Sequence, residues 1–517
     1  MASCLCFRRR RRPIIASSVP FFLLLVSFLA SASASSTTTT KLLGSGNNAT
    51  RRVTFSSEEL RGLRSITARL ARLRDASVKT IQSPDGDVID CVPAHLQPAF
   101  EHPKLRSQKP EEEPEERPRS SAGRFSDADL DEDDDPLPQV WRRSGEHCPE
   151  GTVPVRRTTE DDVLRATASS ATRFGMKARG AGLGFARRDS TGGGHEVSAN
   201  RRSLSHRRGD DGRRSTVNTP IIYLWLCKRS ARNLLINGTP HTMKSGNDTN
   251  NCVIIVVCLR LASPIHPAQH AVGYVTGGQF YGAKASLNVW PAQVASPAEF
   301  SLSQIWVISG AFGNDLNTIE AGWQVSPQLY GDNSPRFFTY WTDDAYQETG
   351  CYNLHCSGFV QTSSRVAIGA AISPVSSYAG RQFDVTLLIW KDPRRGHWWL
   401  QLGSGALVGY WPSALFTHLG SRADMVQFGG EVVNARPAGA PHTPTQMGSG
   451  RFPAEGYARA AYFRNVQLVD WDNNLVPAAG LRLLADRPGC YDIAGGSGGA
   501  WGTYFYYGGP GRNARCP

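Results

Sequence analysis

Two glutamates in the C-terminal half of the chain lie inside apolar stretches and could perform acid–base chemistry. Glu320 lies in TIEAGWQV (318–325), and Glu431 lies in MVQFGGEVV (425–433). Both stretches have the residue types of β-strands, in which alternate side chains point to the same face. The alternation directs Trp323 to the face opposite Glu320, so the core and the carboxyl group are expected on different sides of the strand.

Each glutamate shares its strand face with a carboxamide and a glycine. The two sets are Glu320, Gln324 and Gly322 in the first strand, and Glu431, Gln427 and Gly429 in the second. A glycine between polar side chains is predicted to leave room for another group to approach the backbone. A solvated outer face of the sheet is the alternative, because glutamates on strands commonly face solvent.

Two carboxyl groups that lie close together have pKa values that split, because both cannot ionise cheaply. One can remain an anion and act as a general base on water, while the other keeps its proton and acts as a general acid. Such a pair favours acidic pH, because raising the pH removes the shared proton. Gln324 is a candidate donor to a developing oxyanion. Paired carboxylates on a β-sandwich also cleave sugars, so a glycoside hydrolase is an alternative.

The elements that must position these residues are β-strands. From Ile265 onward, glycine and aromatic residues are abundant, and short strand-like runs recur between turn signals. The runs are Ala283–Val289, Gln304–Ser309, Val366–Ile372, Phe383–Trp390, Trp398–Leu402, Met425–Glu431, Ala461–Leu468 and Trp501–Tyr507. A hairpin is expected around Lys391–His397. The pattern predicts an all-β domain over 265–517, an antiparallel β-sandwich of two sheets.

The first 36 residues have the features of a secretory signal peptide. An arginine run (Arg8–Arg12) precedes an apolar stretch (Val19–Ala30) that ends in small residues. This stretch is shorter than the roughly 20 residues that a membrane-spanning helix needs. The mature protein is therefore expected outside the cytosol, extracellular or vacuolar and apoplastic, with no membrane attachment after the signal is removed.

Residues 53–157 are predicted to form a small α+β region with an acidic linker. Apolar residues recur at helical spacing over 53–76, and a short strand is expected at Val88–Val92. The helix could pack on its own domain or lie across a groove as part of a pro-segment. Residues 107–137 carry blocks of like charge, which predicts a disordered linker.

Residues 180–262 lack helix or strand periodicity, so they are predicted to be a disordered insertion or an aberrant, translated non-coding segment. The sequons at Asn48, Asn237 and Asn247 would carry glycans if the protein is secreted.

The net charge of +12 does not indicate nucleic-acid binding, because the stretch from Ile265 to the C-terminus has 16 basic and 16 acidic side chains. The cysteines fit an oxidising compartment. Cys351–Cys356 and Cys490–Cys516 are the pairings closest in sequence, although spacing alone does not fix connectivity. The cysteine spacing predicts no metal site, and nothing predicts a cofactor.

Several segments resemble the neprosin family of plant prolyl endopeptidases, which are glutamic peptidases. These segments are IEAGWQVSPQLYGD, FFTYWTDDAYQETGCYNLHCSGFV, FGGEVVN and the C-terminal GCYDI and WGTYFYYGGPG. KTIQSPDGDVIDCVPAHLQPAFEHPKL and HCPEGTVPVRR resemble the activation peptide that accompanies this domain. The resemblance covers roughly 53–157 and 265–517 and is lost over 180–262.

The resemblance implies a secreted zymogen whose own propeptide, over 53–157, inhibits a glutamic endopeptidase domain. The catalytic glutamates of the family match Glu320 in EAGWQV and Glu431 in FGGEV. The implied substrates are peptides or proteins, including proline-rich ones, and cleavage is expected next to proline. A non-catalytic cell-wall or extracellular binding protein on the same fold is a further alternative, because the odd middle segment could block maturation.

Overall fold

A computed structural model describes residues 39–43, 51–55, 57–120, 137–167, 177, 222–227, 252–257 and 268–517. The expected signal peptide and the sequons at Asn48, Asn237 and Asn247 lie outside these residues. The chain divides into two compact units, Met1–Ala68 and Arg69–Pro517. In the part of the chain that is described, no helix has the length and apolar character needed to cross a membrane.

In the first unit, strands β1 (Thr39–Leu43) and β2 (Arg51–Phe55) pair antiparallel. The predicted N-terminal helix is present as α1 (Ser57–Asp75), which begins in the first unit and ends in the second. Its partly buried residues include Leu63, Ile66, Leu70 and Leu73, which recur at helical spacing as expected from the sequence.

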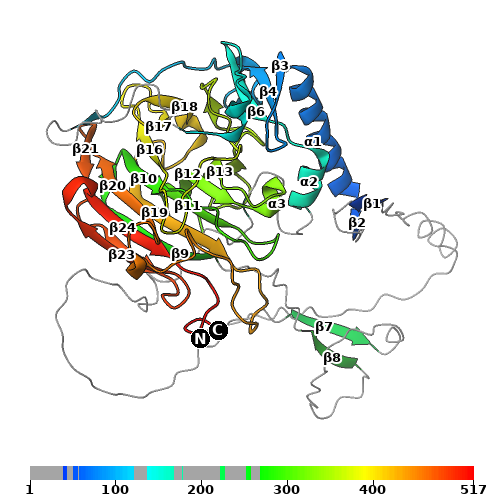
Figure 1. The fold of residues 1–517 in the computed structure, drawn as a ribbon. Helices are drawn as coiled ribbons and strands as arrows, with labels where there is room; N and C mark the ends of the chain where they lie inside the picture. The colour runs from blue at the N-terminus through cyan, green and yellow to red at the C-terminus, as the bar shows by residue number, and fades with distance from the viewer. Residues whose placement is uncertain are drawn as a thin grey trace, which may run out of the picture. The chain divides into compact units, whose positions relative to one another are not determined.

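The second unit is built on a sandwich of two β-sheets, which confirms the predicted fold class (Figure 1). The first sheet has seven antiparallel strands in the order β14-β13-β12-β11-β19-β9-β22. In chain order these are β9 (Ala268–Phe280), β11 (Ser301–Ser309), β12 (Asn317–Val325), β13 (Arg336–Thr342), β14 (Cys351–Tyr352), β19 (Ala423–Val433) and β22 (Arg482–Ala485). Both candidate glutamates lie on this sheet, on β12 and β19.

The second sheet has ten strands and supplies the other wall of the sandwich. They are β5 (Arg119–Ser120), β10 (Gly282–Asn288), β15 (Val360–Gln361), β16 (Asp384–Lys391), β17 (Trp398–Leu402), β18 (Ala406–Trp411), β20 (Ala461–Val469), β21 (Asn474–Pro477), β23 (Asp492–Ser497) and β24 (Thr503–Gly508). The expected hairpin at Lys391–His397 joins β16 to β17. A short helix, α3 (Pro327–Tyr330), follows β12.

The strand expected at Val366–Ile372 is wrong. This stretch makes only isolated bridges, and three different segments share them: Val155 pairs with Ile368, Arg336 with Ala371 and Gln139 with Ile372. Gly369 has a φ of +90°, which interrupts the extended backbone that a continuous ladder needs. The apolar side chains of residues 366–372 are buried nevertheless, so the apolar run reflects burial and not strand pairing.

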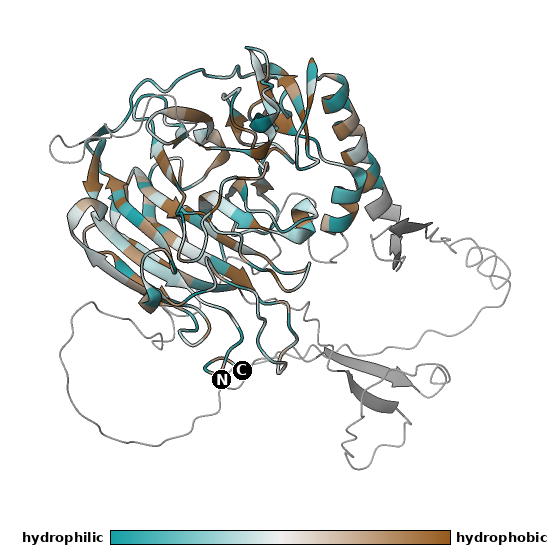
Figure 2. Ribbon diagram, in the orientation of Figure 1, coloured by the Kyte–Doolittle hydropathy of each residue, from teal (hydrophilic) through white to brown (hydrophobic). Residues whose placement is uncertain are grey.

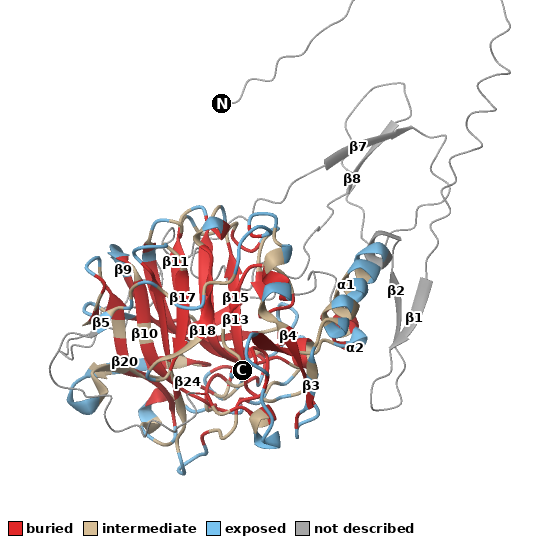
Figure 3. Ribbon diagram, turned by 90° about the horizontal axis from the view of Figure 1, so that it is seen from above, coloured by how far each residue is buried: buried red, intermediate tan, exposed pale blue. Residues whose placement is uncertain are grey.

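The core lies between the two sheets, where the strands are almost entirely buried (Figure 3) and apolar residues alternate with polar ones along them (Figure 2). On β12, Ala321, Trp323 and Val325 all belong to this core. The predicted strand parity is therefore confirmed. Burial of a side chain as large as Trp323 stabilises the fold by about 2–3 kcal/mol, which holds β12 in this register.

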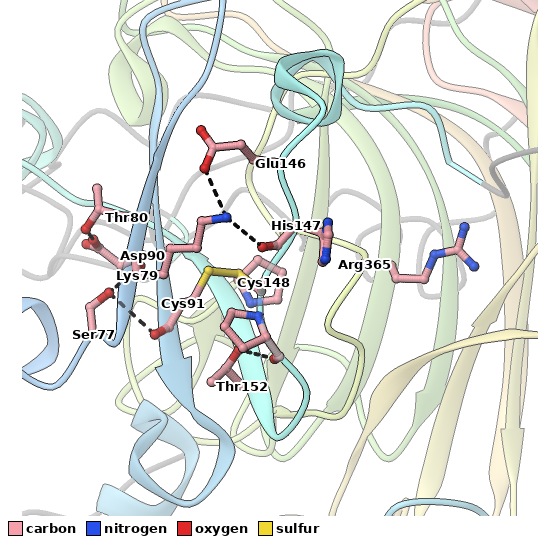
Figure 4. Close-up of a disulfide and its surroundings, with 12 residues drawn as sticks. Ser77, Lys79, Thr80, Asp90, Cys91, Glu146, His147, Cys148, Thr152 and Arg365 are labelled. Carbon is pink, nitrogen blue, oxygen red and sulfur yellow. Dashed lines mark hydrogen bonds and ion pairs between the residues drawn. A yellow bond between two sulfur atoms is a disulfide. The ribbon is translucent and has the colours of Figure 1, made fainter.

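The N-terminal part of the second unit forms a small sheet of its own. Strands β3 (Lys79–Gln82), β4 (Val88–Pro93) and β6 (Thr152–Arg156) pair antiparallel, and α2 (Glu160–Thr167) follows. The strand expected at Val88–Val92 is confirmed as β4. A disulfide between Cys91 and Cys148 ties β4 to the segment before β6 (Figure 4). This sheet is the structural part of the predicted 53–157 region.

The two disulfides expected in the C-terminal domain are both present. Cys351 pairs with Cys356 and Cys490 with Cys516. The imidazole of His442 lies close to the second pair. Because both of those sulfurs are in a disulfide, they offer no thiolate to a metal.

The acidic segment after residue 107 is not disordered over its described part, 107–120, and that expectation was wrong there. Glu115 forms an ion pair with Arg395, and Glu111 lies 3.3 Å from the imidazole of His397. β5 then adds a parallel strand beside β21. The like charges are tolerated because the loop between β16 and β17 supplies basic partners for them. Residues 121–136 lie outside the described part of the chain.

Of the middle segment 180–262, the structure describes two strands, β7 (Ile222–Cys227) and β8 (Cys252–Val257), which pair antiparallel. The other residues of this segment lie outside the described ranges, so its predicted disorder remains a prediction.

A buried ionic cluster joins the N-terminal sheet to the sandwich. The Asp87 carboxylate accepts hydrogen bonds from Arg156 at 2.9 Å and from Arg336 at 2.5 Å. Arg336 also pairs with Asp332. Burial by itself would lower the pKa of Arg336, but its hydrogen bonds and ion pairs with Asp332 and Asp87 raise it above the ordinary value. The Asp87 carboxylate is therefore the shared counter-charge of two guanidinium groups, Arg156 of the N-terminal sheet and Arg336 of the sandwich.

Replacing Asp87 by asparagine should destabilise the uncleaved chain by about 3 kcal/mol, because two buried guanidinium groups lose their shared counter-charge. The measurement is the thermal midpoint of the full-length chain. The same variant trimmed before residue 265 no longer contains residue 87, so its midpoint must equal that of the trimmed wild type. An unchanged midpoint in the full-length variant would show that the cluster does not hold the two parts together.

Two glutamine side chains also connect the N-terminal region to the sandwich, because each amide bonds to the backbone N–H and C=O of one residue, as a neighbouring strand would. Gln97 donates to the carbonyl of Gln361 at 2.9 Å and accepts from its N–H at 2.7 Å. Gln139 does the same at Ala367, at 2.7 and 2.8 Å. Each amide therefore satisfies both backbone groups of one residue in the C-terminal domain.

Candidate active site

Glu320 lies on the face of β12 that points away from the core, and its side chain is completely buried. Both carboxylate oxygens accept hydrogen bonds from neutral side chains. Gln304 on the adjacent strand β11 donates to Oε2 at 2.8 Å, while Thr318 and Tyr346 donate to Oε1 at 2.9 and 2.7 Å. An ionised carboxylate can only accept, so this set of donors matches a carboxylate held as an anion.

Glu431 lies on β19, two strands from β12 with β11 between them, and is also completely buried. Neither of its carboxyl oxygens has a hydrogen-bond partner among the described residues. Burial raises the pKa of Glu431; the charges of Lys177 and His270 act against this, and that of Glu320 adds to it. The two glutamates therefore have different environments: Glu320 has hydrogen-bond donors at both oxygens, whereas the donor nearest to Glu431 is the Lys177 ammonium, at 3.6 Å.

Lys177 brings the two glutamates to one place. Its ammonium Nζ lies 2.5 Å from Oε2 of Glu320 and 3.6 Å from Oε2 of Glu431, and the lysine side chain is completely buried. The ammonium also lies over the rings of Tyr340 and Tyr346, at 5.4 and 5.6 Å from their centroids. A single lysine from far upstream in the sequence thus fills the space in front of both carboxyl groups.

The lysine carries a positive charge in this position. Burial by itself would lower the pKa of Lys177, but the charges of Glu320 and Glu431 raise it above the ordinary value. Burial and the charge of Glu320 likewise raise the pKa of Tyr346 well above its ordinary value, so its phenol stays neutral and donates to that carboxylate. The site is therefore a pair of buried carboxyl groups with a single ammonium group between them, and burial raises the pKa of one of the two, Glu431.

The alternative interpretation required the polar faces of β12 and β19 to be exposed to solvent. They are not, because both glutamates are fully buried. Gly322 does not leave room for a ligand either. A Cβ at that position would lie 2.0 Å from the carbonyl oxygen of Ser303 on β11, so the glycine is needed for close approach of the neighbouring strand.

Gln324 is buried on the Glu320 face, and its amide donates to the Tyr330 hydroxyl at 2.9 Å. Among the described contacts, none joins Gln324 to Glu320 or Glu431. Its proposed role as an oxyanion donor stays a prediction.

The residues that surround the pair were not found from the sequence. Gln304, Tyr346 and His270 come from β11, from the loop after β13 and from β9, and their proximity depends on the order of strands in the sheet. Lys177 lies in a stretch that carried no motif. The one available signal was strand parity on β11, which places Gln304 on the face opposite Ile305, a core residue.

Comparison with known families places two models on the chain. Residues 297–510 match the Neprosin model, which includes both glutamates, and residues 80–200 match the model of the Neprosin activation peptide, which includes Lys177. Together the two matches cover more than half of the 517 residues.

Similar solved structures include two peptidases. One is scytalido-glutamic peptidase with a peptide-based transition-state analogue, at 10% identity and a TM-score of 0.26. The other is SCP-B, a member of the Eqolisin family of peptidases, in a complex with the tripeptide Ala-Ile-His, at 9% identity and a TM-score of 0.25. Each match covers 46% of this chain and 97% of the other, and at these TM-scores neither supports an inference.

Proposed function

Because the chain belongs to the neprosin family and carries both an activation peptide and a peptidase domain, we propose that it is the zymogen of a glutamic endopeptidase. Glu320 and Glu431 are its catalytic pair, and the enzyme cleaves next to proline. We further propose that it is a secreted, disulfide-bonded protein, extracellular or vacuolar, that acts on protein or peptide substrates.

The observation that carries this proposal is the position of Lys177. A lysine of the activation peptide caps both glutamates, at 2.5 and 3.6 Å, and fills the space that a substrate and water would need. Burying an ion pair away from solvent costs free energy, because both charges lose their hydration. We propose that this arrangement is kept because it makes the precursor latent: the cation neutralises the pair until the peptide is removed.

The different environments of the two glutamates suggest their roles. Glu320, with donors at both oxygens, holds a negative charge and acts as general base on a water molecule. Glu431, whose pKa is raised by burial, keeps its proton, polarises the scissile carbonyl and then protonates the leaving nitrogen. Attack by water, collapse of the tetrahedral intermediate and transfer of the proton release an amine and a carboxylic acid.

The trimmed enzyme should be active at acidic pH and lose activity as the pH rises through the pKa of Glu431. The pKa of this group is raised, so the acid form persists to a higher pH than in an exposed glutamate and is lost above that value. The measurement is the rate of peptide cleavage between about pH 3 and pH 8. A rate that increases steadily through neutrality would contradict a proton-donating glutamate.

The substrate class is tested in the same assay with matched peptides. One peptide contains a single proline, the second has alanine at that position, and an oligosaccharide panel tests glycoside cleavage. Preferential cleavage beside proline supports the proposal. Hydrolysis of sugars alone would favour the glycoside hydrolase, and no cleavage of any substrate after trimming would favour a non-catalytic binding protein.

A further inference from the structure

A buried histidine lies beside Glu431 and is not among the donors to the glutamate pair. In the antiparallel pairing of β9 with β19, His270 is the direct partner of Glu431. Directly paired residues of neighbouring strands point to the same face, with Cβ atoms about 5 Å apart. The imidazole and the carboxyl group are therefore neighbours in a part of the sheet from which solvent is excluded, since His270 is 5% exposed.

Asp486 fixes this histidine at three points. The Asp486 carboxylate Oδ2 accepts from the backbone N–H of His270 at 2.9 Å and lies 3.1 Å from ring Nδ1. The backbone N–H of Asp486 donates in return to the His270 carbonyl at 2.9 Å. Because an ionised carboxylate only accepts, Nδ1 is the protonated nitrogen and Nε2 is the one that titrates.

The environment favours the charged form of the imidazole. Burial by itself would lower the pKa of His270, but its hydrogen bond and ion pair with Asp486, together with the charge of Glu431, raise it above the ordinary value. The His270 and Asp486 side chains are only 6% and 4% exposed, so their charges are poorly screened.

The charged and titratable groups that act on Glu431 come from several segments. They are Glu320 on β12, Lys177 from the activation peptide, Tyr346 and Tyr352 around β14, His270 on β9 and, through it, Asp486 after β22. The two tyrosines are neutral, because burial raises the pKa of each well above its ordinary value. Once the activation peptide has left, His270 is the cation that remains in this set.

We infer that His270, oriented by Asp486, is a positioning residue that limits the proton affinity of Glu431 in the mature enzyme, where Lys177 is no longer present. The inference rests on the proposed function of Glu431 as the proton donor. A carboxyl group that held its proton too tightly would be a poor acid, and the neighbouring imidazolium corrects for the burial that Glu431 undergoes.

In the trimmed enzyme, His270→Gln should move the alkaline limb of the kcat/KM profile upward by about one pH unit, the usual effect of one neighbouring charge. The glutamine retains an N–H for Asp486 but carries no charge. His442→Gln is the matched control, since His442 is also buried and contacts Gln269 and Thr443. The inference is overturned if active His270→Gln keeps the wild-type profile or if both variants shift alike.

A second measurement separates this inference from the proposed function. Coupling between two titrating groups is reciprocal, so Glu431→Gln should lower the pKa of the His270 ring by a similar amount. NMR of the imidazole in the trimmed domain measures this without any turnover, and it also applies if His270→Gln fails to fold. An unchanged ring pKa rejects the coupling even in an active enzyme. Full peptidase activity in Glu431→Gln rejects the proposed function, whatever the ring does.

Discussion

Replacing either Glu320 or Glu431 by glutamine should lower kcat/KM of the trimmed enzyme by about a thousandfold or more, because each carboxyl group provides one of the two proton transfers. In Glu320→Gln, the donors from Gln304, Thr318 and Tyr346 would face an amide that cannot take a proton from water. In Glu431→Gln, the amide has no acidic proton to give to the leaving nitrogen. The measurement is steady-state cleavage of the proline-containing peptide at acidic pH.

The control for these variants is Glu299→Gln. Glu299 is equally buried but accepts hydrogen bonds from Thr443, Thr445 and the N–H of Ala435, outside the candidate site. It should retain kcat/KM within a fewfold even if its thermal midpoint decreases. If the three variants lose activity to the same extent, the loss reflects the removal of a buried carboxylate in general. If Glu320→Gln and Glu431→Gln stay fully active, the pair is not catalytic.

The second large effect is expected from Lys177→Met in the full-length chain. In the uncleaved chain, the closed form has residue 177 over the glutamate pair, and in the open form this segment has moved away. Methionine keeps the bulk of the side chain but leaves Glu320 buried without its cation, which destabilises the closed form by about 3–5 kcal/mol. The open form is not destabilised, because water hydrates the pair there. At 1.4 kcal/mol per tenfold, the open fraction, and with it the activity of the uncleaved chain, should increase about a hundredfold or more.

The measurement is the initial rate of peptide cleavage while gel electrophoresis shows the chain to be intact. Lys104→Met is the matched control, because Lys104 also connects the N-terminal region to the peptidase domain, through the Ala414 carbonyl at 2.9 Å, but lies outside the site. It should remain latent. A Lys177→Met chain as inactive as the wild-type precursor would show that latency does not depend on this ion pair.

Strand alternation was sufficient to predict the architecture of the sandwich and the direction of the two glutamates. It works on β12 because Ala321, Trp323 and Val325 are apolar on one side only. It fails at Val366–Ile372, where an equally apolar run is buried by docking against the N-terminal region and not by strand pairing. The pattern of apolar residues along a segment therefore predicts its burial. Whether the buried segment pairs as a strand depends on which other segments of the chain lie next to it.

The surroundings of the pair could not be predicted in the same way. His270 meets Glu431 because β9 lies beside β19, although more than 150 residues separate them in the chain. Lys177 meets Glu320 across a similar separation. Contacts of this kind are set by tertiary topology, and a lone lysine has no spacing that distinguishes it from a surface residue.

The side-chain amides of Gln97 and Gln139 matter for the peptidase domain once the N-terminal region has been removed. While the chain is whole, they occupy the N–H and C=O groups of Gln361 and Ala367. Their departure takes these partners from the backbone of Gln361 and Ala367, although the Ala367 carbonyl still accepts from the N–H of Ala370. Removal of the N-terminal region therefore leaves backbone groups at two separate positions to be satisfied by water or by another chain, at the same moment that it opens the glutamate pair.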